Sequence, residues 1–246
     1  MLIKILVFIA ALLIGSFLNV VIHRLPRRES LLWPASHCPQ CGHRLTARDL
    51  IPLASYLWLG GRCRHCGGPI RLRYPLIELM TAVGFLLVYL KWGAGWQTVA
   101  GWVFTSFLIT AAFIDIENGI IPDRLTYPGM LAGLALSIFT IGIKSSLIGW
   151  LVYGSFLLVT ALISRGGMGG GDVKMAAAIG AFLGFPASLL ALFLSSLLGG
   201  IWAAALLIGK KATRKTAIKF GPFLSLGAWL VLICGQQLIN LYLSLY

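Results

Sequence analysis

The chain has few charged residues and very few acids. Charged side chains make up 11% of its 246 residues, whereas a typical soluble domain carries about 25%. Only seven residues are Asp or Glu, while hydrophobic residues make up 59% of the chain. This abundance of apolar residues excludes a disordered or collagen-like chain. The scarcity of charge excludes an ordinary soluble domain and predicts a membrane protein.

Several common catalytic motifs are also missing. The sequence has no His-Glu-x-x-His motif of zinc proteases, no Gly-Lys-Ser/Thr phosphate loop, and no serine in a nucleophile-elbow context. All four histidines lie between residues 23 and 65. The few acids therefore become the main candidates for chemistry.

About eight apolar stretches approach the length that a helix needs to cross a bilayer, roughly 17 to 25 residues. We therefore expect an all-α polytopic membrane protein with about eight transmembrane helices. The stretches are 2–23, 75–91, 97–116, 125–143, 146–164, 173–185, 187–208 and 221–244, of which the sixth is short and rich in glycine. A cleavable signal peptide is the alternative interpretation of the first stretch, but no small-residue cleavage site follows it, so we expect a retained span.

The basic residues are distributed unevenly around these stretches. If the polar segment 24–74 is cytosolic, only Lys4, Lys91 and Lys144 lie outside, and 17 of the 20 Lys and Arg lie on the cytosolic side. This asymmetry is typical of cytoplasmic loops and predicts an outside N-terminus. All seven acids then lie at or near the cytosolic face, where we expect the chemistry. Topology and anionic lipids explain the net charge of +13, so we expect contact with the lipid bilayer and no nucleic-acid partner.

Four of the five cysteines form two Cys-x-x-Cys pairs in segment 24–74. The pairs are Cys38 with Cys41 and Cys63 with Cys66, and a glycine follows each. Four thiolates complete the tetrahedral shell of a zinc ion, and glycine permits the tight turn around it. Because this shell leaves no open position, we expect a structural zinc that orders a loop with little apolar core. Disulfides are the alternative, which a reducing compartment disfavours. Three histidines are alternative ligands: His37, His43 and His65.

Two acids at the ends of apolar stretches are candidate catalytic residues. Asp115 lies at the end of 97–116, and an ionisable group at such a depth is a functional candidate by default. Asp172 follows a glycine-rich tract and precedes 173–185. The glycines can let an extended substrate backbone lie against Asp172, although a flexible connector is the alternative. Cytosolic loops place the two aspartates at the same membrane level.

Two carboxylates that share a proton can cut a peptide bond without a metal. One activates water as a base, and the other protonates the departing amine as an acid. We therefore predict a membrane aspartyl protease with Asp115 and Asp172 as catalytic residues. The residues expected to support the catalytic loops are Gly169, Gly171, Lys174 and Asp123. For Asp123, a helix N-cap role is the alternative.

Two other functional classes also fit parts of the pattern. In a carrier or channel, Asp115 and Asp172 would bind a translocated ion. The acids lie near one face, however, and the two halves of the chain have no evident internal repeat. In a non-catalytic assembly factor, the four-cysteine loop would dock a partner and the acids would cap helices.

The motifs together resemble those of the type IV prepilin peptidases, which are GxGD-type aspartyl proteases of bacterial membranes. The resemblance rests on the paired cysteines and on segments 15–26, 73–78, 114–123 and 169–174. It implies that Asp115 and Asp172 are the catalytic aspartates. It also implies a location in the bacterial cytoplasmic membrane, with the four-cysteine loop and the active site on the cytosolic side.

The resemblance further implies the substrates and a second activity. The family cleaves the leader peptides of prepilins, pseudopilins and competence-pilin precursors just before their hydrophobic helix. Many members also methylate the new N-terminus with S-adenosylmethionine, an activity associated with the loop-bearing N-terminal part. We therefore expect a first transmembrane helix at 1–23, a four-cysteine loop associated with methyl transfer at 24–74, and a membrane-embedded peptidase domain at 75–246.

Overall fold

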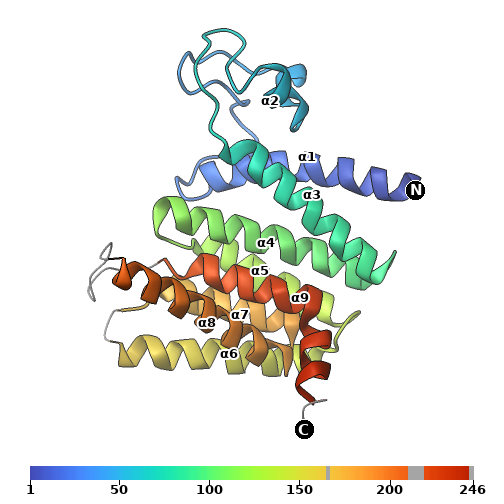
Figure 1. The fold of residues 1–246 in the computed structure, drawn as a ribbon, viewed down its shortest axis with the longest axis vertical. Coiled ribbons are helices and arrows are strands. Elements are labelled where there is room, and N and C mark those ends of the chain that lie inside the picture. The colour runs from blue at the N-terminus through green and yellow to red at the C-terminus, as the bar shows by residue number, and fades with distance from the viewer. Residues whose placement is uncertain (165–166, 210–218, 244–246) are drawn as a thin grey trace. The chain divides into compact units, whose positions relative to one another are not determined.

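The computed structural model describes residues 1–164, 167–209 and 219–243. In this part of the chain the protein is all-α, and it divides into two compact units, Met1–Gly93 and Ala94–Tyr246 (Figure 1). The first unit contains α1 (Leu2–Arg24), α2 (Ala54–Trp58), α3 (Arg73–Trp92) and a 3-10 turn at Ala47–Leu50. The second contains α4 (Trp96–Asn118), α5 (Asp123–Ser137), α6 (Ile143–Ile163), α7 (Gly170–Leu183), α8 (Ala187–Ile208) and α9 (Gly221–Leu243).

Each of the eight predicted apolar stretches contains a helix, and six of these helices in the described residues are long and apolar enough to cross a membrane. The protein is thus a multi-pass membrane protein. The two shorter helices are α5, with 15 residues, and α7, with 14. The predicted end of α5 at residue 143 is wrong. The helix ends at Ser137 because Gly142, at φ +83°, closes a turn and donates its N–H to the Ser137 carbonyl.

In the first unit, α1 packs against α3 at very short range. A Cβ atom added to Gly15 would lie 2.7 Å from the Cα atom of Glu78, so only glycine fits at this crossing. One turn further along α1, the buried Asn19 donates its amide to the Tyr74 carbonyl at 3.1 Å. Both ends of segment 25–72 are therefore attached to one tightly packed helix pair.

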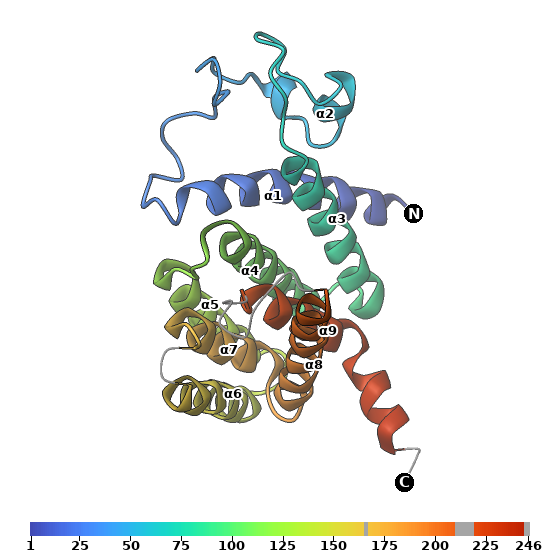
Figure 2. The same ribbon diagram turned by 60° about the vertical axis from the view of Figure 1, so that its left-hand side comes forward.

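In the second unit, α7 is the central helix. It contacts α4, α5, α6, α8 and α9, and Figure 2 shows these helices around it. Seven consecutive residues of α7, 175–181, are buried, and most of them are alanine or glycine. A helix that is apolar on all sides is expected in a protein interior.

Small side chains allow this central position. A Cβ atom added to Gly180 would lie only 2.2 Å from the Gly149 carbonyl oxygen of α6, which shows how closely the two backbones approach. The N-terminal end of α7, which carries Asp172, is therefore held by packing on several sides.

Candidate active site and four-cysteine metal site

Asp115 lies in the last turn of α4, where its side chain is buried and only 5% exposed. The helix ends because Gly119 has a left-handed conformation, with φ +67°, and donates its N–H to the Asp115 carbonyl. On the opposite side, Asp115 Oδ2 accepts the N–H of Gly221, the first residue of α9, at 3.0 Å. The carboxylate is thus held between two helix ends.

Asp172 lies in the first turn of α7. Its N–H donates to the carbonyl of Gly169, which has an extended conformation and precedes the helix. A Cβ atom added to Gly171 would lie 3.0 Å from the Ile121 carbonyl oxygen, so glycine allows segment 119–122 to pass beside α7. The glycine tract therefore brings the chain that follows Asp115 next to Asp172.

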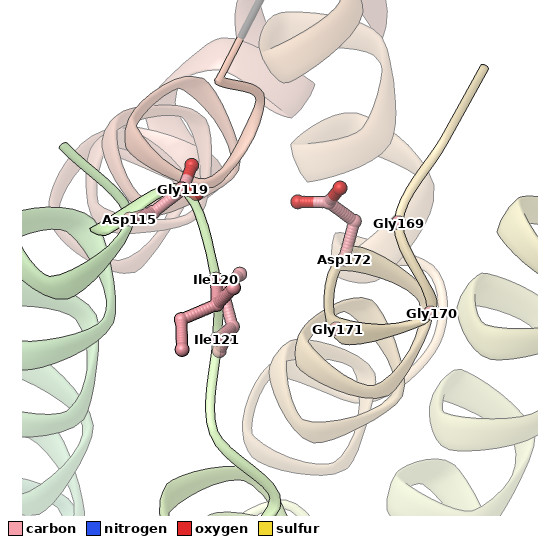
Figure 3. Close-up of a pocket in the computed structure, with 8 residues that line it drawn as sticks. All are labelled: Asp115, Gly119, Ile120, Ile121, Gly169, Gly170, Gly171 and Asp172. Atoms are coloured by element: carbon pink, nitrogen blue, oxygen red, sulfur yellow. The ribbon is translucent and has the colours of Figure 1, made fainter. Parts of the chain in front are cut away.

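The two aspartates line one cavity of about 250 Å³ in the second unit. Figure 3 shows that Asp115 reaches it from the end of α4, while the Asp172 carboxylate points into it from the start of α7. The other lining residues are Gly119, Ile120, Ile121, Gly169, Gly170 and Gly171. The structure thus brings both predicted catalytic aspartates, Gly169 and Gly171 together.

The electrostatics of Asp172 reflect this arrangement. Asp172 lies across the same cavity from the charge of Asp115. Two close carboxylates resist double ionisation, so the pair is expected to share one proton. The cavity can therefore hold a proton donor beside a proton acceptor.

Lys174 and Asp123 do not line the cavity. Lys174 Nζ lies 2.6 Å from Asp123 Oδ1 and 5.1 Å from the centre of the Tyr127 ring. The pair joins α7 to the first turn of α5. The alternative interpretation of Asp123 as an N-cap is wrong, because Pro122 occupies that position and the carboxylate binds Lys174 instead.

The predicted cluster of four cysteines is confirmed. The Sγ atoms of Cys38, Cys41, Cys63 and Cys66 all lie within 4.8 Å of one another, and those of Cys38 and Cys66 are 3.9 Å apart. Tetrahedral ligation with metal–sulfur bonds of about 2.3 Å places sulfur atoms about 3.8 Å apart, so the cluster suits a metal ion. All four cysteines are free, which contradicts the disulfide alternative, and no histidine joins the cluster found among the described residues.

The two cysteine turns have the same backbone pattern. The Cys38 N–H donates to the His43 carbonyl and the Gly42 N–H donates to the Cys38 carbonyl, and the corresponding two bonds form around Cys63. Backbone hydrogen bonds from Cys41 and then Gln40 lower the pKa of the Cys38 thiol to about 6. Thiolates are the form that binds metal, so the first turn favours ligation by Cys38.

Glu78 is a buried residue that the sequence interpretation did not select. It is 7% exposed, and its Oε2 accepts the Leu53 N–H at 2.8 Å. Leu53 has a φ of +58°, which a residue with a side chain rarely adopts, so this bond helps to fix a strained point of the loop. The sequence does contain a signal for Glu78, because it is the only acid within the apolar stretch 75–91.

Segment 219–221, which contacts Asp115, was not selected either. Its contact is made by a backbone N–H, which no residue type identifies in a sequence.

Comparison with known proteins identifies relatives over nearly the whole chain. Residues 9–92 match the model of the bacterial peptidase A24 N-terminal domain, and residues 102–204 match that of the type IV leader peptidase family. A prepilin leader peptidase/N-methyltransferase of Aeromonas salmonicida is 38% identical, covering 97% of this chain and 93% of the relative. The protein of the same name from Pseudomonas aeruginosa is 37% identical, covering 95% and 91%. No solved structure matches the chain.

We expect the purified protein to bind about one metal ion per chain through its four thiolates. Replacing Cys38 or Cys63 with serine removes one ligand from a different cysteine turn, and each change should lower the metal content at least about tenfold. Elemental analysis of protein purified in detergent without chelators measures this content. Cys234→Ser is the control, because Cys234 lies in α9 outside the cluster. Unchanged metal content in the Cys38 and Cys63 variants would contradict the assignment.

Proposed function

Because the chain belongs to the type IV leader peptidase family, we propose that it is a membrane aspartyl endopeptidase that removes the leader peptides of type IV prepilins or prepilin-like proteins. Asp115 and Asp172 are its catalytic pair. The observation that supports this assignment best is the shared cavity, which both carboxylates line and into which Asp172 points (Figure 3). The name shared by the relatives supports prepilins as the substrate class. We extend the proposal to pseudopilins and competence-pilin precursors because the family resemblance implies them.

The cavity suits an extended peptide. Four of its eight lining residues are glycine, on the two segments that flank the aspartates. Because these four glycines have no side chains, a substrate backbone can approach both carboxylates. In the reaction, one aspartate takes a proton from water as the oxygen attacks the scissile carbonyl, and the other gives its proton to the departing amine.

Four further residues support this cavity in the proposal. Gly169 and Gly171 keep the approach to Asp172 open, and a side chain at Gly171 would press on the Ile121 carbonyl. The ion pair of Lys174 and Asp123 holds the start of α5 against α7 beside the cavity. None of these residues takes part in proton transfer.

We infer that α5 and α7 cross the membrane together with the six longer helices, which gives eight spans. Burial explains how α7 can be short, because its middle contacts other helices. The excess of basic residues on one side supports an outside N-terminus, with the four-cysteine loop and the active site on the cytosolic side of the bacterial cytoplasmic membrane. A prepilin with a cytosolic leader and a hydrophobic helix in the bilayer would present its scissile bond at this level.

The four-cysteine cluster belongs to a separate function in this proposal. Zinc is the ion that four thiolates in two short turns favour, and its role is to order segment 24–74. Peptide cleavage is assigned to the region 75–246, whose catalytic cavity lies entirely in the second unit. The lipid bilayer is the surrounding partner, and no nucleic acid is required.

Methyl transfer from S-adenosylmethionine to the new N-terminus is supported by the relatives' name and by the match of residues 9–92. A cavity of about 320 Å³ in the four-cysteine loop is lined by Trp33, Pro34, Ala35, His37, Gly42 and Arg44. This lining has no carboxylate, the group that often binds ribose hydroxyls. It does not fit the donor well, so no residue is assigned to the transfer step.

The peptidase proposal is tested by cleavage of a purified prepilin in detergent. We expect Asp115→Asn and Asp172→Asn each to lower kcat at least about a hundredfold, because each removes one half of the proton-transfer pair. Glu29→Gln, an acid-to-amide change at an exposed position, is the matched control and should cleave like the wild type. Cleavage within about tenfold of wild type in either aspartate variant would contradict the assignment, and ion flux in liposomes would then test the carrier alternative.

A further inference from the structure

Residues 219–221, which lead into α9, lie beside the carboxylate of Asp115. This segment belongs to neither of the helices that carry the two aspartates. The Gly221 N–H donates to Asp115 Oδ2 at 3.0 Å, across a separation of 106 residues. A Cβ atom added to Gly221 would lie 2.8 Å from the same Oδ2 atom and 3.1 Å from Cγ. A side chain at this position would therefore press on the Asp115 carboxylate, which instead accepts the backbone donor directly.

Lys219 contributes a cation beside the same group. Its Nζ donates to the Ile116 carbonyl at 2.6 Å, at the end of α4 where helix carbonyls lack partners within the helix. From this position the Lys219 charge also attracts the Asp115 carboxylate. A cation at a helix C-terminus is favourable in its own right, so the lysine binds the C-terminal end of α4 and also lies near the aspartate.

The surroundings of the two aspartates are consequently unequal. Asp115 accepts the Gly221 N–H at the N-terminus of α9 and lies near the Lys219 charge, and these two groups stabilise its ionised carboxylate against the cost of burial. Asp172 faces the negative charge of Asp115 across the cavity. The Lys174 charge is paired with Asp123, and Glu117 follows Asp115 on α4 itself.

We propose that residues 219–221 form a third part of the peptidase site, in which Gly221 and Lys219 favour Asp115 as the ionised member of the pair, so that Asp115 is the base and Asp172 is the acid. This inference rests on the proposed peptidase function. Gly221 and Lys219 are positioning residues, since they act through Asp115 and do not touch the reacting atoms.

The assignment gives each proton a definite path. Asp115 takes one proton from the attacking water as the new carbon–oxygen bond forms at the scissile carbonyl. Asp172 gives its proton to the amide nitrogen as the carbon–nitrogen bond breaks, which releases the leader carboxyl group and the mature amino group. Asp115 is then protonated and Asp172 ionised, and transfer of one proton between them restores the starting state.

Two variants of Lys219 test the charge. Lys219→Gln removes the cation but keeps an N–H donor for Ile116, whereas Lys219→Arg keeps both. Because loss of the cation makes ionisation of the base harder, we expect the acid limb of the pH profile of kcat/KM to move upward by at least about half a pH unit in Lys219→Gln. Lys219→Arg should keep the wild-type limb. At pH values well above the limb, Lys219→Gln should approach the wild-type rate.

A purely structural lysine would give a different result. The rate of Lys219→Gln would then fall by the same factor at every pH, with no movement of the acid limb, and this outcome would overturn the proposal. Absence of cleavage by the wild type itself would instead contradict the peptidase function, so the two failures are distinguishable.

Gly221→Ala tests the backbone contact independently. The added methyl group displaces the Asp115 carboxylate, so we expect kcat to fall at least about tenfold with KM changed less than about threefold. Gly200→Ala in α8 is the matched control, because a Cβ atom there has no neighbour within 4 Å. Wild-type kcat in a folded Gly221→Ala protein would overturn the proposal, and if that variant does not fold, the Lys219 pair decides the question alone.

Discussion

Two carboxylates that line one small cavity cannot both ionise without electrostatic cost, and much of the second unit can be understood from this constraint. Asp115 and Asp172 come from helix ends that are far apart in sequence. Close packing of α7 by small residues holds one aspartate in place, and the left-handed turn at Gly119 ends α4 just after the other. A protein that keeps two acids in such a place gains a shared proton, which is what hydrolysis by an aspartate pair needs.

The first unit is ordered by different interactions. Segment 25–72 is long and polar and contains only one short α-helix and a 3-10 turn, so it has little apolar surface to bury. Its order instead depends on local connections, which are the four clustered thiols and the bond from Leu53 to the buried Glu78. The two activities named for the relatives therefore fit a chain in which a helix bundle and a loop with four clustered thiols are built by separate interactions.

Much of this architecture is predictable because it depends on local sequence signals. Apolar runs locate the helices, and Cys-x-x-Cys spacing predicts the thiol cluster. The end of α5 was missed because a turn closed by Gly142 interrupts an apolar run. The contact of Gly221 with Asp115 could not be predicted, since it joins residues 106 positions apart through a backbone group. Tertiary packing alone makes that contact.

The central claim is that Asp115 and Asp172 act as one proton-sharing unit. The most direct measurement compares kcat for prepilin cleavage in Asp115→Asn, Asp172→Asn and the double variant. Residues that act as a unit are strongly non-additive, so the account predicts that the double variant is no slower than the slower single variant, within about threefold. If the two losses instead multiply, the aspartates act independently and the account is contradicted.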